Sequence, residues 1–198
     1  MTAPQAEPGT VEPAVPLYTI HRYPVHLIDR WAVPDGRMVM VRPVLPQDDV
    51  LAQLFVRGLS PESRYQRFLV GMSELPPGML SALTQVDYCS HLALLAEIFE
   101  EHAEVQIGEA RYVVDGTAGD GGLNADFAIA VADGWNRLGV GSRLLRGLED
   151  AARTAGVTRF TGDVLRDNRR AIDFMRYRGF SFAPNREEPR LVRAVKEL

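Results

Sequence analysis

The stretch of residues 124–142 constrains the fold of this chain more than any other. It begins with the apolar run 125–131, which is too short for a core helix and ends at the turn pair Asp133-Gly134. These features predict a buried strand. From Val140 onward, apolar residues recur at helical spacing until Gly156, which predicts a helix that ends there. The sequence therefore predicts a strand that leads into a helix through a glycine-rich turn.

A glycine-rich turn at the start of a helix can bind an anion such as phosphate. The first backbone N–H groups of a helix have no partner within the helix, and the helix dipole adds partial positive charge there. Gly139 and Gly141 carry no Cβ, so a phosphate can approach the backbone closely. A tight connection whose glycines serve packing explains both residues equally well. The turn has neither the Walker pattern nor the third glycine of the dinucleotide fingerprint.

The turn resembles motif A of the GNAT N-acetyltransferases, in which Q/R-x-x-G-x-G/A follows a strand and binds the pyrophosphate of acetyl-CoA. Here the pattern is Asn136-Arg137-Leu138-Gly139-Val140-Gly141, with Asn in the place of the family's Gln or Arg. A later stretch resembles motif B, because Asn168, Ala171 and Gly179-Phe180 match the family's Asn-x-x-Ala and its helix ending in Gly-Phe. By this resemblance Asn168 would hydrogen-bond the pantetheine arm, although Asn is also a good helix cap.

The resemblance also implies the residues that bind acetyl-CoA. They are Ile129, Ala130, Val131, Asn136, Arg137, Leu138, Gly139, Val140, Gly141, Ser142, Asn168, Ala171 and Met175. The backbone amides of motif A would hold the pyrophosphate, and the open edge of the strand would pair with the pantetheine arm. Met175 stands where many members have a tyrosine that protonates the leaving thiolate, and methionine cannot donate a proton. No metal site is predicted.

The other elements follow the order expected of the GNAT fold. Residues 25–31 and 37–42 flank Asp35-Gly36, which predicts a hairpin. Helices are predicted at 46–59, from Ser60 and at 76–83, then strands at 91–99 and 105–114 and a glycine-rich loop at 115–122. After the motif A helix come a strand at 159–165, a helix at 168–178 and strands at 180–183 and 191–195. The predicted class is α/β of the α+β kind: a mixed, mostly antiparallel sheet flanked by helices, with an N-terminal β-hairpin.

Two more segments resemble the acetyltransferase domain of the bacterial Pat-like protein lysine acetyltransferases. They are Ser60-Pro61-Glu62-Ser63-Arg64-Tyr65-Gln66-Arg67-Phe68 and Val86-Asp87-Tyr88-Cys89-Ser90-His91-Leu92-Ala93-Leu94-Leu95-Ala96. In that branch the domain is often fused to a nucleotide-sensing or acyl-CoA synthetase-like domain. We expect no room for either in these 198 residues.

Acetyl transfer to an amine needs a proton acceptor, since a free lysine amine titrates near ~10.4. Asp126 is the predicted general base, because it stands where the Pat-like branch has a glutamate and lies beside an apolar run that would raise its pKa. A solvent-facing aspartate, or one paired with an arginine, is the alternative. Glu109 on the neighbouring strand is the second candidate base. Cys89 is expected in the core rather than as a nucleophile.

Composition limits the partners and the compartment. A net charge of −4 argues against nucleic acid as a partner, and no segment has the length of a membrane span. The single Cys89 excludes an internal disulfide and fits a reducing cytoplasm. Residues 1–16, with four prolines, are predicted to be a disordered tail, and residues 17–198 a single GNAT acetyltransferase domain.

The sequence thus predicts a cytoplasmic, acetyl-CoA-dependent N-acetyltransferase that passes the acetyl group directly to an amine. The acceptor is a protein lysine or a small-molecule amine, and a homodimer is left open. The alternative is a non-catalytic acyl-CoA sensor or scaffold, which Asn136 and Met175 keep open.

Overall fold

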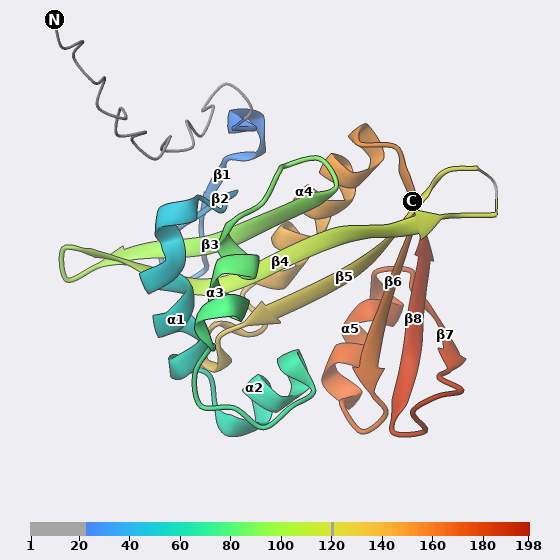
Figure 1. The fold of residues 1–198 in the computed structure, drawn as a ribbon. Coiled ribbons are helices and arrows are strands. Elements are labelled where there is room, and N and C mark those ends of the chain that lie inside the picture. The colour runs from blue at the N-terminus through green and yellow to red at the C-terminus, as the bar shows by residue number, and fades with distance from the viewer. Residues whose placement is uncertain (1–22, 120) are drawn as a thin grey trace, which may run out of the picture.

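The structure, a computed structural model, describes residues 23–119 and 121–198, and all strands of this part of the chain belong to one sheet (Figure 1). Its strands are β1 (Asp29–Ala32), β2 (Met38–Pro43), β3 (His91–Glu100), β4 (Ala103–Thr117), β5 (Leu123–Val131), β6 (Val157–Leu165), β7 (Ser181–Pro184) and β8 (Leu191–Glu197). The helices are α1 (Asp49–Gly58), α2 (Pro61–Phe68), α3 (Pro77–Thr84), α4 (Val140–Thr154) and α5 (Arg169–Tyr177), with short 3-10 turns η2 (Val25–Leu27), η3 (Pro46–Asp48) and η4 (Asp133–Trp135). The predicted tail at residues 1–16 lies outside the described residues.

The strand order is β1-β2-β3-β4-β5-β6-β8-β7. Neighbouring strands are antiparallel except β5 and β6, which are parallel and are joined through α4. The predicted mixed, mostly antiparallel sheet with an N-terminal hairpin is therefore confirmed.

Two predicted boundaries differ from the structure. The strand predicted at 25–31 begins only at Asp29, because Leu27 and Ile28 donate their backbone N–H groups to Pro24 and Val25 and so close a 3-10 turn. The loop predicted at 115–122 is shorter, because β4 continues to Thr117 and β5 begins at Leu123. In the first place a local turn delays the strand, and in the second the pairing of β4 with β5 continues as far as Thr117 and Leu123.

Helices cover both faces of the sheet. The apolar side of α4 is buried against one face, where it joins residues of β3–β6 and α5 in the largest core cluster. The helices α1, α2 and α3 lie on the other face and form a smaller core around Phe55, Val56, Leu59 and Leu75. The only lysine of the chain, Lys196 on β8, ties the sheet to α4, since its Nζ lies 2.7 Å from the buried carboxylate of Glu149.

The sheet opens in the middle, between β5 and β6. The two strands pair only as far as Asp126 and Thr161, so no strand in the described part of the chain lies beside residues 127–131 of β5 on that edge. Figure 1 shows the two halves of the sheet diverging from this point. Gly162 permits the close approach just before the opening, because a Cβ there would lie 2.9 Å from the ring and the carbonyl oxygen of Phe127. The unpaired edge of β5 is the feature that places the candidate site.

Candidate functional site

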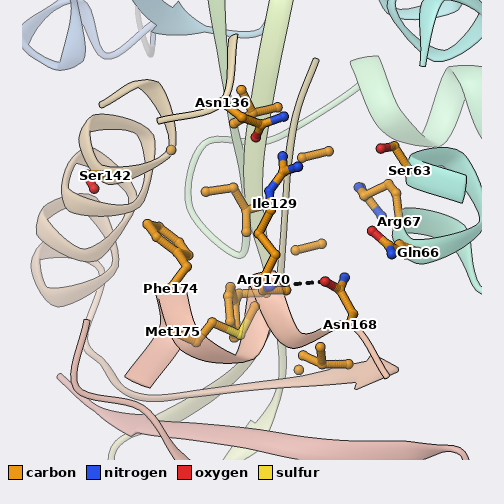
Figure 2. A pocket seen from close by; sticks show the side chains of 18 of the residues that line it. Ser63, Gln66, Arg67, Ile129, Asn136, Ser142, Asn168, Arg170, Phe174 and Met175 are labelled. Carbon is orange, nitrogen blue, oxygen red and sulfur yellow. Dashed lines mark hydrogen bonds between the residues drawn. The ribbon is translucent and has the colours of Figure 1, made fainter. Parts of the chain in front are cut away.

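A cleft of about 300 Å³ lies at the opening between β5 and β6. Its walls come from β5, the turn before α4, the starts of α4 and α5, and one side of α2 (Figure 2). The predicted acetyl-CoA-binding residues that line it are Ile129, Ala130, Val131, Asn136, Arg137, Gly139, Gly141, Ser142, Asn168, Ala171 and Met175. Leu138 and Val140 do not line it, because their side chains pack on the core; Val140 is only 1% exposed.

The start of α4 forms one end of the cleft. Gly139 is the N-cap, with a left-handed φ of 86°, and no side chain among the described residues caps the helix, so backbone N–H groups of its first turn are left to an external partner. A Cβ on Gly141 would lie 3.6 Å from both Phe174 and Val131, so this position faces the narrow space between β5 and α5. A phosphate group fits these residues, because the backbone amides and the positive end of the helix dipole face the space beside Gly139 and Gly141, where no Cβ blocks its approach.

Asn136, the residue that departs from motif A, has a local structural role. Its amide nitrogen donates to the carbonyl oxygens of Asp133, at 2.9 Å, and Ala132, at 3.3 Å. These bonds hold the turn between β5 and α4 in shape. The side chain is therefore occupied within the turn, while the backbone amides of the motif remain at the edge of the cleft.

The start of α5 forms the opposite wall. Asn168 caps this helix, since its Oδ1 accepts a hydrogen bond of 3.0 Å from the backbone of Ala171 (Figure 2). Its amide nitrogen makes no hydrogen bond to the described residues and so stays available for a ligand. Arg170 extends into the cleft, and Met175 lies at its base, 6% exposed.

The helix α2 supplies a wall that the sequence motifs did not indicate. Ser63, Gln66 and Arg67 line the cleft and are seen at its right in Figure 2. Asp133 tethers this helix to the turn after β5 by accepting hydrogen bonds from the Ser60 backbone, at 3.0 Å, and from Ser63 Oγ, at 2.6 Å. Ser60, where the helix is predicted to start, caps it, because Ser60 Oγ accepts a bond from the Ser63 backbone. Only the three-dimensional structure reveals that Arg67 faces β5.

Glu109, the second candidate base, lies buried between two guanidinium groups. Arg67 Nε and Arg111 Nη2 each donate to it at 2.8 Å. Although burial alone would raise the pKa of Glu109, the two arginines outweigh it and lower the pKa to about 2. Glu109 is therefore ionised at every physiological pH and is a poor acceptor for a proton from an amine. Its evident role is to position Arg67.

Asp126 has the opposite electrostatic setting. It lies on the exposed part of β5, makes no hydrogen bond or ion pair among the described residues, and does not line the cleft itself. It shares a face of β5 with Ala128 and Ala130, which do line the cleft, so roughly 7 Å of strand separates it from the nearer of them. The surrounding protein partly removes water from its carboxyl group, and the nearby Asp115 and Asp163 add repulsion, so its pKa rises to about 6.

The expectation that Cys89 is a core residue is wrong, because it is exposed in the loop before β3 and does not line the cleft. Within the described ranges, no group of three or more His, Cys, Asp or Glu side chains has the arrangement of a metal site. No helix in that same part of the chain is long and apolar enough to cross a membrane.

Comparison with known proteins adds independent information. A family model described as the acetyltransferase (GNAT) family matches residues 78–180. An acetyltransferase of Pseudomonas aeruginosa is 32% identical over 130 residues, which are 65% of this chain and 68% of that protein. The acetyltransferase Pat of Mycolicibacterium smegmatis is 32% identical over 136 residues, which are 69% of this chain and 39% of Pat, so the chain matches less than half of that relative's length.

Among solved structures, the GNAT domain of the S. lividans protein PAT superposes with a TM-score of 0.78 at 27% identity. The match covers 89% of this chain and 99% of that domain. The fold expected from the sequence is thus confirmed.

Proposed function

Because this chain belongs to the GNAT family of acetyltransferases, we propose that it transfers the acetyl group of acetyl-CoA to an amine. The observation that carries the proposal is the unpaired edge of β5 next to the uncapped, glycine-rich start of α4, within one cleft. The edge can pair with the amide groups of a pantetheine arm, and the helix start can bind a pyrophosphate.

The chain would hold acetyl-CoA at three places. The amides around Gly139, Gly141 and Ser142 would bind the pyrophosphate, and residues 129–131 of β5 would pair with the pantetheine arm. The amide nitrogen of Asn168, which has no partner within the described ranges, would donate a further hydrogen bond. Bound acetyl-CoA supplies the activated acetyl group, and the protein has to position it, exclude other acceptors and take a proton from the amine.

We propose that Asp126 accepts the proton from the amine. A carboxylate whose pKa is about 6 is largely ionised at neutral pH and still takes up a proton readily. The side chain lies outside the cleft, so the proton would reach it through a water molecule. The nitrogen–carbon bond forms as the carbon–sulfur bond breaks, the electron pair of that bond stays on sulfur, and the sulfur is protonated from solvent. Met175 cannot supply that proton.

A second function is kept open by Met175 alone. A buried methionine in the cleft, where many relatives place a tyrosine, also suits a module that binds acyl-CoA without turning it over. Since Asn136 has a structural role in the turn, it no longer favours this alternative.

The test combines binding and turnover. Isothermal titration calorimetry with acetyl-CoA measures whether the cleft binds it, and release of CoA thiol with a panel of amines and lysine-containing proteins measures transfer. Binding with turnover supports the enzyme, binding without turnover on any acceptor supports the sensor, and no binding overturns both.

The similarity to Pat, together with the segments at Ser60 and Val86, favours a protein lysine over a small amine as acceptor. We further propose one acetyltransferase domain over residues 17–198 and a cytoplasmic location. Analytical ultracentrifugation would decide whether the protein forms a homodimer.

A further inference from the structure

We propose that Arg67 is a catalytic residue whose guanidinium group hydrogen-bonds the acyl carbonyl oxygen and stabilises the negative charge that develops on it. This inference rests on the proposed acetyl transfer and adds a side-chain donor from α2 to the backbone N–H groups that the open edge of β5 offers. Glu109 and Arg111 act through Arg67 as positioning residues.

The first argument is geometric. Arg67 Nε is fixed 2.8 Å from Glu109 Oε1, and Glu109 lies opposite Ala130 in the pairing of β4 with β5. The guanidinium group is thereby held beside the part of β5 that lines the cleft, and Arg67 itself lines the cleft from the α2 side. Figure 2 shows Arg67 and the β5 residue Ile129 on facing sides of this space.

The second argument concerns the unused donors of Arg67. Only Nε takes part in a hydrogen bond or ion pair within the described residues, and the face of the group lies on the Phe68 ring at 4.7 Å. The side chain is 11% exposed, yet its terminal nitrogens are not among the buried atoms that lack a partner. They are therefore accessible, and because Arg67 lines the cleft, its guanidinium edge can donate to an oxygen bound there.

The third argument is electrostatic. Arg67, Glu109 and Arg111 carry two positive charges and one negative charge, so the group has a net charge of +1. Glu109 stays ionised because its pKa is about 2, which keeps Arg67 in place across the working pH range. Arg111 is anchored in turn to the Leu83 carbonyl at 3.1 Å. A cation held in advance, in a site of little water, stabilises developing charge without reorganising.

The alternative reading is that Arg67 only satisfies the charge of Glu109. Both readings predict that loss of Arg67 destabilises the fold, because it leaves a buried carboxylate with one partner. Only the catalytic reading predicts that the acyl carbonyl of bound ligand is polarised by Arg67. The experiment therefore needs a signal from that carbonyl which does not depend on turnover.

The probe is acetyl-CoA labelled with ¹³C at the carbonyl, studied by difference infrared spectroscopy on the bound complex. The variants are Arg67→Lys and the double variant Arg67→Ala with Glu109→Gln, which removes the unpaired buried carboxylate. The charge-matched control is Arg57→Ala, since Arg57 forms an exposed ion pair with Glu74 and does not line the cleft. Thermal unfolding and calorimetry first establish that each variant is folded and binds acetyl-CoA.

We expect the carbonyl stretch to shift to lower frequency on binding to the wild type and to Arg57→Ala. The shift should shrink in Arg67→Lys and shrink further in the double variant, where only backbone donors remain, with kcat down by about 10²–10³ and the Kd for CoA little changed. Added guanidinium ion should restore part of the shift in the double variant. An unchanged shift in folded variants that still bind overturns the inference. Failure of the wild type to bind acetyl-CoA overturns the proposed function instead.

Discussion

The sharpest prediction concerns the pH dependence of acetyl transfer. If Asp126 accepts the amine proton, it must be ionised to act, so turnover is lost as pH falls through its pKa of about 6. The ionised fraction is about 0.9 at pH 7 and about 0.1 at pH 5, so the rate should fall roughly tenfold between them. A base with the pKa of Glu109, about 2, would leave the rate flat over the same range.

The neighbours of Asp126 make the prediction specific. Charged groups act on it from four elements: Asp115 on β4, Asp163 on β6, Arg193 on β8 and Arg67 on α2. Asp115→Asn removes a repelling carboxylate and should move the midpoint of the profile to lower pH. Asp126→Asn should lower kcat by about 10²–10⁴ and abolish the acidic limb. It should not destabilise the fold at neutral pH, because a raised pKa means that the ionised carboxylate is disfavoured in the folded state.

The assay is CoA release with a saturating acceptor between pH 5 and pH 8, a range chosen to bracket a pKa near 6. Protein incubated at each pH is then returned to neutral pH and its activity is measured again. Full recovery shows reversible protonation, and loss of activity shows unfolding. A wild-type profile that stays flat, or an Asp126→Asn variant that keeps the acidic limb, would refute the assignment.

Three further predictions test the cleft. Gly141→Val should abolish CoA binding in calorimetry, while Gly141→Ala should retain it. A single Cβ stays 3.6 Å from Phe174 and Val131, whereas a branched side chain fills the space between them. Equal CoA affinities of the two variants would contradict the placement of the pyrophosphate. Met175→Leu should leave the pH profile of turnover unchanged, since the two side chains are similar in volume and neither can donate a proton to the thiolate. Loss of the alkaline limb of the profile in this variant would contradict that expectation. Asn168→Asp should keep the melting temperature, because an oxygen still caps α5, but it should weaken CoA binding because the amide donor is gone. Asn168→Ala should weaken CoA binding and also lower the free energy of unfolding by about 1 kcal/mol. Tight CoA binding by Asn168→Asp would show that the amide does not contact the ligand.

The sequence predicts the fold well where a local pattern decides the structure. The Asp35-Gly36 pair predicts the first hairpin, and Gly36 has the left-handed φ of 88° that such a turn requires. Ser60 predicts the start of α2 and does cap it. The stretch from β5 to α4 also contains its own signals, because its apolar run, its glycines and its helical spacing all lie within a few residues.

The parts that the sequence does not predict depend on contacts between distant residues. The pairing of Arg67 with Glu109 joins residues 42 positions apart, and nothing in either segment indicates the other. The same holds in part for the pKa shifts of Glu109 and Asp126: burial acts on both, while Arg67 on α2 helps to lower the first and Asp115 and Asp163 on other strands help to raise the second. The prediction for Cys89 is wrong for a related reason: the strand after it is buried, but the loop that contains it is not.

The single lysine of this chain has a consequence for any experiment on acetylation. A protein that modifies lysine side chains can also modify itself, and such self-labelling often masks the signal of the true acceptor. Here Lys196 is the one internal target, and its side chain is 15% exposed and engaged with Glu149 and the ring of Phe180. Lysine acetylation detected at any site other than Lys196 therefore reports on the acceptor, which makes this chain a low-background tool for finding it.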